Sequence, residues 1–153
     1  MSEDTPEKSA PITPYLYYED VEGALDWLSR AFGFREREAE TMRDPEGKVV
    51  HASMALGDAV ILLGFPGKGY QCPKRLGQVT QNLYVYVPDV ERHLEHARQA
   101  GAEIFSEAED TFYGDRRYGV ADLEGHHWYF AEKIRAMAPE DWQPTQEDLK
   151  GHR

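Results

Sequence analysis

The 153-residue sequence has a single cysteine, few basic residues and no long apolar run. The one cysteine, Cys72, cannot form an intramolecular disulfide, which is typical of proteins in a reducing compartment. No stretch approaches the roughly 20 apolar residues that span a bilayer, and the polar first ten residues lack the apolar core of a signal peptide. We therefore expect a cytoplasmic protein that does not enter a membrane.

Positive charge is also scarce, because 17 Lys and Arg stand against 28 Asp and Glu, for a formal net charge of −11. Such a field repels phosphate backbones and anionic lipid surfaces, so neither nucleic acid nor a membrane is an expected partner. The same field favours a neutral or cationic small molecule. Hydrophobic residues make up 41% of the chain, which is enough for the core of one compact domain.

One order of predicted elements occurs twice along the chain. The first copy has a strand at 12–18, a helix at 21–31, and strands at 35–42, 49–56 and 59–63. The second copy has a strand at 80–87, a helix at 90–99, and strands at 103–106, 116–122 and 127–131. Asp20 and Asp89 are candidate N-caps at matching positions, and Gly33 and Gly101 follow the two helices. The repeat, about 70 residues long, indicates a duplicated βαβββ half-domain rather than a solenoid.

The repeat defines the expected domain organisation. Residues 1–10 are polar and expected to be disordered. Residues 11–132 form one domain, made of modules 11–64 and 79–132 joined by a linker at 65–78. Residues 133–153 form a charged tail with Trp142 as an isolated aromatic anchor.

Three segments resemble the vicinal oxygen chelate superfamily, which includes glyoxalases, bleomycin resistance proteins and dioxygenases. They are PYLYYEDVEGALDWLSRAFGF (14–34), LYVYVPDVERHLEHARQAGA (83–102) and YGDRRYGVADLEGHHWYF (113–130). Leu123 stands where the family's last turn usually has proline. The resemblance implies an α+β fold of two tandem βαβββ modules, whose curved mixed sheets enclose a shared cavity with the helices outside. It also implies a homodimer.

Side-chain alternation predicts which faces of the first strands look into this cavity. The aliphatic side chains of both strands suit packing under the helices. The opposite faces carry Thr13, Tyr15 and Tyr17 in the first module and Asn82, Tyr84 and Tyr86 in the second. We interpret this second set as a ligand-facing wall. The alternative is that the tyrosines fill the core with locally satisfied hydroxyls.

Metal-dependent members of the family take their ligands from the first and last strands of each module. The resemblance places these positions at Thr13, Ile61, Asn82 and Tyr129. A protein-bound divalent ion needs about three His, Glu, Asp or Cys donors, and of the neighbouring residues only Gln81 could coordinate. We therefore predict no metal cofactor, with a divalent metal as the open alternative.

Histidines supply the titratable candidates. His51 lies in the middle of a predicted strand and is the preferred acid/base candidate, although a lone strand histidine is more often part of the scaffold. His127 shares side-chain parity with Tyr129 and is expected to face the cavity. His93 and His96, on the second helix, are expected to face solvent.

Two functions follow. The first is a metal-free protein that binds a small aromatic or cationic ligand, as bleomycin resistance proteins do; the second is a metal-dependent enzyme of glyoxalase or dioxygenase type. A metal-free enzyme that uses His51 or a tyrosine is a third possibility. The predicted ligand-binding residues are Thr13, Tyr15, Tyr17, His51, Asn82, Tyr84, Tyr86, His127 and Tyr129.

Overall fold

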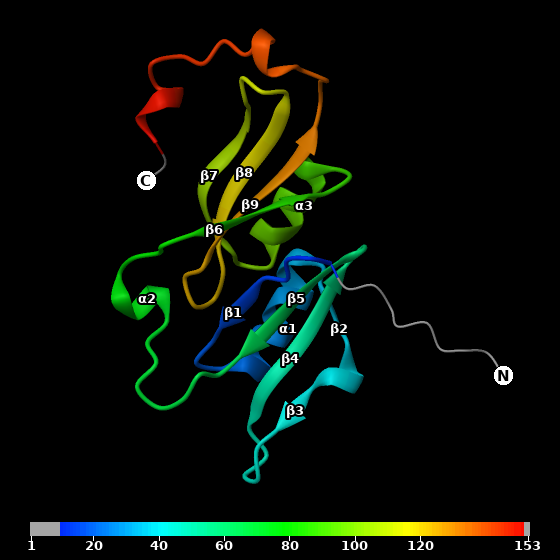
Figure 1. Ribbon diagram of the computed structural model, residues 1–153, viewed down its shortest axis with the longest axis vertical. Helices are drawn as coiled ribbons and strands as arrows, with labels where there is room; N and C mark the ends of the chain where they lie inside the picture. Colours follow the sequence, from blue (N-terminus) through cyan, green and yellow to red (C-terminus); the bar gives the residue numbers. More distant parts are fainter. Residues whose placement is uncertain (1–9, 152–153) are drawn as a thin grey trace, which may run out of the picture.

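A computed structural model describes residues 10–151 of the chain, so the expected disorder of the N-terminus falls almost entirely outside the described residues. Two modules lie end to end (Figure 1). The first contains β1 (Tyr15–Tyr17), α1 (Val21–Phe32), β2 (Arg35–Glu36), the 3-10 helix η1 (Glu38–Glu40), β3 (Met42–Arg43), β4 (Val49–Leu56) and β5 (Ala59–Gly64). The second contains β6 (Asn82–Tyr86), α3 (Val90–Gln99), β7 (Glu103–Asp110), β8 (Asp115–Ala121) and β9 (His127–Lys133). Between them lies α2 (Pro73–Leu76), and the tail carries η2 (Pro139–Asp141) and η3 (Asp148–Lys150).

The two sheets have the same topology, which confirms the tandem α+β fold. Sheet A has the order β1-β5-β4-β2, with β3 also paired to β4, and sheet B has the order β6-β9-β8-β7. In each sheet the first strand runs parallel to the last, with Tyr15 opposite Leu62 and Tyr84 opposite Tyr129. Tyr15 and Tyr84 are thus structural equivalents, 69 residues apart.

The helices begin and end where the sequence predicts. Asp20 accepts a hydrogen bond from the Gly23 backbone N–H at 3.0 Å, and Asp89 accepts one from the Arg92 N–H at 3.1 Å. Each bond satisfies one of the free N–H groups of a helix N-terminus. Gly33 closes α1 in the left-handed conformation, with φ 84°, which residues with a Cβ rarely adopt.

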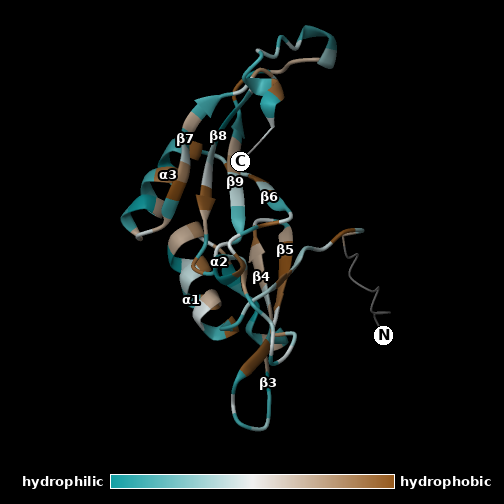
Figure 2. Cartoon of the chain, turned by 90° about the vertical axis from the view of Figure 1, so that its left-hand side faces the viewer, coloured by the Kyte–Doolittle hydropathy of each residue, from teal (hydrophilic) through white to brown (hydrophobic). Residues whose placement is uncertain are grey.

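Both helices cover the same side of the two sheets (Figure 2). Phe32, at the end of α1, joins the modules because its ring contacts Trp128 and Phe130 of β9 at centroid distances of 5.4 and 4.8 Å. His93 adds a polar link: its Nε2 donates to the Phe32 carbonyl at 2.9 Å, and its Nδ1 accepts from the Tyr118 hydroxyl. The expectation that His93 faces solvent is therefore wrong, whereas His96 is exposed.

A second link between the modules comes from the turn between β8 and β9. The Asp122 carboxylate, 5% exposed, accepts hydrogen bonds from the Tyr18 hydroxyl at 2.7 Å and the Trp128 indole at 3.1 Å. Its other oxygen accepts from the Glu124 and His126 backbone N–H groups, both at 3.0 Å. One buried carboxylate thus holds its own turn and the end of β1 together.

Several predicted elements differ from the structure. The strand predicted at 12–18 is shorter, at Tyr15–Tyr17. The strand predicted at 35–42 is present only at its ends, as β2 and β3, because η1 interrupts it at Glu38–Glu40, where glutamates disfavour a strand. The predicted linker contains α2, which starts at Pro73 and is too short to show helical periodicity. Strand β7 extends to Asp110, past two register irregularities that obscure its alternation. No helix among residues 10–151 is long and apolar enough to cross a membrane.

Candidate functional site

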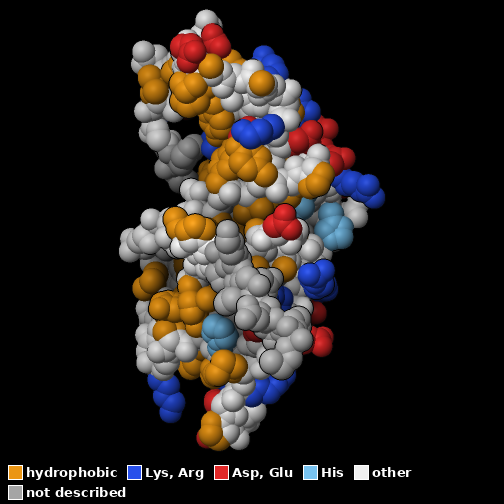
Figure 3. Space-filling view, turned by 45° about the vertical axis from the view of Figure 1, so that its right-hand side comes forward, with side chains coloured by type: hydrophobic (Ala, Val, Ile, Leu, Met, Phe, Trp, Pro, Cys, Tyr) orange, Lys and Arg blue, Asp and Glu red, His pale blue; other side chains and the backbone are white. Residues whose placement is uncertain are grey.

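The sheet faces turned away from the helices, here called the open faces, carry two matching pairs of tyrosines. Tyr15 and Tyr17 meet edge to face at 5.7 Å and 67°, and Tyr84 and Tyr86 do so at 5.6 Å and 68°. All four are substantially exposed, between 37% and 51%. Figure 3, which looks partly onto this side, shows hydrophobic and aromatic side chains over both modules. The predicted division between aliphatic and tyrosine faces is therefore the one the structure has.

A buried carboxylate organises the tyrosines of sheet B. Asp115, at the start of β8, is 1% exposed, and one of its oxygens accepts from the Tyr84 and Tyr86 hydroxyls, both at 2.8 Å. The Tyr113 hydroxyl lies 3.0 Å from that of Tyr84. We call Tyr84, Tyr86, Tyr113 and Asp115 the tyrosine–aspartate cluster. Charged acceptors make such hydrogen bonds stronger than neutral ones.

The environment keeps these phenols protonated. Burial, followed by the hydrogen bonds to Tyr113 and Asp115, raises the pKa of Tyr84 far above its ordinary value. Burial and then Asp115 raise the pKa of Tyr86, against the opposing effect of Lys133. At neutral pH both hydroxyls are therefore hydrogen-bond donors to Asp115.

Two cationic side chains already lie over tyrosine rings on the open face of sheet B. The Arg117 guanidinium lies 4.8 Å from the centroid of Tyr129, and Lys133 Nζ lies 4.9 Å from that of Tyr86. Tyr129 in turn stacks with Tyr84 at 6.3 Å. Such contacts arise because the ring face has negative potential. The open face of sheet B can therefore attract cations, and a ligand there would meet Arg117 and Lys133.

Sheet A uses a different polar partner for its tyrosines. His51 of β4 shares a hydrogen bond of 2.8 Å between its Nδ1 and the Tyr15 hydroxyl. His51 pairs with Gly64 of β5, which in turn pairs with Tyr17 of β1. In sheet B, Arg117 pairs with Ala131 of β9, which in turn pairs with Tyr86 of β6. His51 and Arg117 therefore occupy equivalent positions in the two sheets. The tyrosine geometry repeats, but the charged or titratable groups beside it do not.

The remaining predicted residues lie around these two centres. His127 stacks on Phe105 at 4.4 Å, and Gly119 makes room for that ring, because a Cβ there would lie 2.4 Å from it. Asn82 pairs with His127 across β6 and β9 and is exposed, whereas Thr13 precedes β1. The structure thus brings together Tyr84, Tyr86 and Tyr129, and separately Tyr15, Tyr17 and His51.

Each tyrosine pair borders its own depression. Tyr15 and Tyr17, with residues of the connection such as Tyr70 and Leu76, line one of about 280 Å³. Tyr84 and Tyr86 line another of about 390 Å³, with apolar side chains beside β6. Within one chain the two pairs therefore lie in separate hollows.

One of the metal positions carried over from the family needs correction. Ile61 is 4% exposed and lies in the core, whereas strand register makes Leu62 the equivalent of Tyr129. The corrected set is Thr13, Leu62, Asn82 and Tyr129. Since none of them has a carboxylate, imidazole or thiolate, this set does not fit a divalent ion.

Another group of potential donors lies between the modules. Glu19, Cys72 and Glu124 have ligand atoms within 4.8 Å of one another. The two Glu124 oxygens already accept from the Glu19 and Asp20 backbone N–H groups at 2.6 and 2.9 Å, and Glu19 accepts from the Cys72 N–H at 3.0 Å. Burial raises the pKa of the Cys72 thiol, which disfavours the thiolate that a metal requires. We assign this group to the junction of the modules.

Sequence reasoning missed the central member of the site. The predicted strand at 116–122 begins one residue after Asp115. The neighbouring Arg116 pairs with an acid, with its Nε 2.7 Å from Asp110. Asp115 shares parity with Arg117 and Gly119 on β8, so a strand start placed one residue earlier would have put it on the open face.

Comparison with known proteins agrees with this architecture. Residues 10–130 match the sequence model of the Glyoxalase/Bleomycin resistance protein/Dioxygenase superfamily. The crystal structure of TioX from Micromonospora sp. ML1 is similar, with 34% identity, a TM-score of 0.63, and coverage of 84% of this chain and 100% of that one. An uncharacterised protein of Mycobacterium tuberculosis is 28% identical over 137 residues, covering 86% of this chain and 79% of the relative.

A more distant structure shows the same fold: FosX, a fosfomycin resistance protein from Listeria monocytogenes, has a TM-score of 0.60 at 12% identity, covering 88% of this chain and 98% of that one. The paired βαβββ modules with open faces define the vicinal oxygen chelate fold. This chain belongs to the Glyoxalase/Bleomycin resistance protein/Dioxygenase superfamily.

Proposed function

We propose that this protein binds a small aromatic or cationic molecule on its open faces, without the superfamily's metal site. The observation that carries the proposal is Asp115: a carboxylate 1% exposed that holds two partly exposed tyrosine hydroxyls at 2.8 Å. Aromatic walls with a few fixed polar groups are typical of small-molecule sites. Ring faces attract organic cations, and the net charge of −11 favours their approach.

The internal cations support the choice of ligand. Arg117 and Lys133 lie over the rings of Tyr129 and Tyr86, so these faces accept a positive group at ordinary cation–π distances. A cationic aromatic ligand can do more than either side chain, because it also stacks its own ring on the tyrosines.

We also propose that a second copy of the chain completes the site. The tyrosine pairs of one chain border separate hollows of about 280 and 390 Å³, each open to solvent. A partner that places its sheet A opposite sheet B would enclose a ligand between two aromatic walls. Light scattering coupled to size exclusion should then give twice the mass of one chain, and a monomer at micromolar concentration would contradict the dimer.

The binding test uses three probes of one shape and different charge. They are 9-aminoacridine, which is cationic at neutral pH, acridine, which is neutral at that pH, and acridine-9-carboxylate, which is anionic. By calorimetry we expect the cation to bind most tightly and the anion least tightly. Equal affinities for all three, or no binding by any, would overturn the proposal.

Asp115→Asn tests the role of the buried charge. It should weaken 9-aminoacridine binding about tenfold, or about 1.4 kcal/mol, and change acridine binding much less. The matched control is Asp58→Asn, which removes the same charge from an exposed turn. If both variants weaken the cation equally, the effect comes from overall charge rather than from the cluster.

The alternative function is a metal-dependent enzyme of glyoxalase or dioxygenase type. Such chemistry needs a divalent ion as Lewis acid, and the residues at the family positions do not fit one. Metal analysis of the purified protein, before and after exposure to Zn²⁺, Ni²⁺, Mn²⁺ and Fe²⁺, tests this point. One equivalent of tightly held metal would overturn the metal-free assignment.

A further inference from the structure

The C-terminal tail, residues 134–151, lies beyond the segment that matches the family and turns back onto sheet B (Figure 1). It is fixed at the turn between β7 and β8, where the Gly114 carbonyl accepts from the Ile134 and Arg135 N–H groups at 2.9 and 3.1 Å. A Cβ at Gly114 would lie 2.4 Å from the Arg135 carbonyl oxygen. The close approach of the tail therefore requires glycine at this turn.

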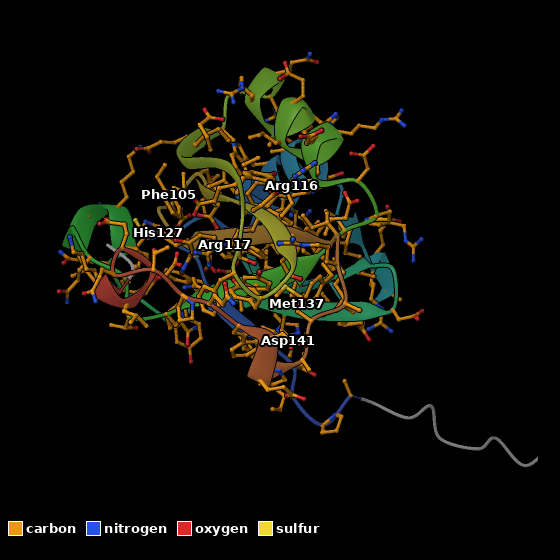
Figure 4. The ribbon with its side chains drawn as sticks, turned by 90° about the horizontal axis from the view of Figure 1, so that it is seen from above. Phe105, Arg116, Arg117, His127, Met137 and Asp141 are labelled. Carbon is orange, nitrogen blue, oxygen red and sulfur yellow. The ribbon has the colours of Figure 1, made fainter. Side chains whose placement is uncertain are left out.

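The tail lies on the ligand side of the sheet. Figure 4 shows Met137 and Asp141 of the tail on one side of sheet B and α3 on the other, with Arg117 between them. Arg116 points the opposite way, toward Glu91 of α3, with 3.4 Å between their charged atoms. The tail thus lies over the β7–β8 side of the open face of sheet B, while Tyr84 and Tyr86 of β6 stay 37% and 51% exposed.

Trp142 connects the tail to the tyrosine–aspartate cluster. Its ring meets Phe112 edge to face at 5.7 Å and lies 6.2 Å from Tyr113. The Tyr113 hydroxyl is 3.0 Å from that of Tyr84, which donates to Asp115. Trp142 therefore packs on a residue that is itself part of the cluster.

A cavity of about 410 Å³ lies between the tail and the sheet. Its floor includes Arg117 and Tyr113, and its roof comes from Glu147, Asp148 and Gly151 of the tail. The floor residues also border the ring faces of the open face, because Arg117 lies over Tyr129. Tyr113, a member of the cluster, thus lies in the floor of this covered space.

From these contacts we infer that the tail is a lid over the β7–β8 side of the sheet B half of the site, and that Trp142 is the latch that holds it closed. This inference rests on the proposed function and adds that the tail retains the bound ligand. The Trp142 contacts hold the segment against the β7–β8 turn, and Glu147 and Asp148 line the cavity together with Arg117. A cationic aromatic ligand is thus covered on the side where the open face would otherwise release it.

The test measures dissociation of 9-aminoacridine by stopped flow from the full-length protein. Trp142→Ala removes both ring contacts, so the dissociation rate should rise about tenfold, with an association rate within about twofold of wild type. Trp142→Phe should keep most of the retention. The matched control is Leu149→Ala, in the same tail, because Leu149 is apolar and 68% exposed.

Hydrogen exchange adds a second readout that a purely structural tail would not move. The probe should slow amide exchange over residues 139–151 in wild type but not in Trp142→Ala. Equal dissociation rates in wild type and Trp142→Ala, or equal acceleration by Trp142→Ala and Leu149→Ala, would overturn the latch while the proposed function stands. Failure of wild type to bind any acridine would overturn the proposed function, and the lid with it.

Discussion

Asp122→Asn should destabilise the protein far more than a chemically identical change elsewhere. The turn Asp122–Gly125 and the turn Asp44–Gly47 share one motif, in which an aspartate oxygen accepts from the backbone N–H groups two and four residues later at 2.9 to 3.0 Å. Of these two aspartates, only Asp122 uses its second oxygen to accept from buried side chains outside the turn, those of Tyr18 and Trp128. Comparing Asp122→Asn with Asp44→Asn therefore separates the contribution of the local turn to stability from that of the link between the modules.

The magnitude follows from the donors. In Asp122→Asn the amide oxygen can serve the backbone pair, but the NH₂ then faces the Tyr18 hydroxyl and the Trp128 indole. A buried donor left without an acceptor costs about 1–3 kcal/mol. Two such donors, partly relieved by rotation of the hydroxyl, give a loss of about 2–5 kcal/mol in the free energy of unfolding. In Asp44→Asn the NH₂ faces solvent, and the loss should stay below about 1 kcal/mol.

Urea unfolding followed by tryptophan fluorescence measures both variants. Tyr18→Phe should cost less in the Asp122→Asn background than in wild type, with a coupling of about 1–2 kcal/mol, because the two groups share one bond. If Asp122→Asn and Asp44→Asn lower the free energy of unfolding by the same amount, the reasoning is wrong and the link carries no weight.

Three further predictions use single measurements. Asp115→Asn should lower the pKa of Tyr86, because the carboxylate raises it; phenolate absorbance during an alkaline titration would show an earlier transition, and an unchanged curve would contradict the cluster. Burial raises the pKa of Tyr70 to about 12, so the protonated phenol favours the folded state. Its contribution to the free energy of unfolding should be lost as the pH rises from about 10 to 12. Tyr70→Phe should therefore flatten the fall in melting temperature over that range. His93→Ala should lower the free energy of unfolding by about 1–3 kcal/mol. His96→Ala, which removes one exposed bond to the Arg30 carbonyl, should lower it by less than about 1 kcal/mol. Equal losses in the two variants would show that His93 does not form the stabilising link between the helices.

The sequence predicted the elements whose signals are local. The caps at Asp20 and Asp89 follow from hydrogen bonding within one turn, and the helix at 90–99 matches α3 at both ends. Strand β4 also matches, at Val49–Leu56, because turn residues at Asp44–Gly47 and at Gly57 and Asp58 bound it on both sides. Where the pattern is interrupted, at η1 and at the irregular register of β7, the prediction was wrong or too short.

The site was predictable only in part, for a similar reason. Alternation on the first strands is a property of each strand alone, so the tyrosine faces could be assigned. The partners of those tyrosines depend on pairing between distant strands: Asp115 reaches Tyr84 and Tyr86 only because β8 and β6 both flank β9. The role of the tail depends on how the chain turns at Gly114, which no periodicity encodes.

The two tyrosine pairs have the same geometry but different polar partners, so each site of the proposed dimer would have two unlike walls. A composite site built from sheet A of one copy and sheet B of the other has an imidazole, His51, at one wall and a carboxylate, Asp115, at the opposite wall. A two-fold axis makes the two composite sites identical to each other, but neither is symmetric within itself. A ligand with distinct ends therefore has one preferred orientation in both sites, and a ligand with identical ends leaves one wall poorly matched.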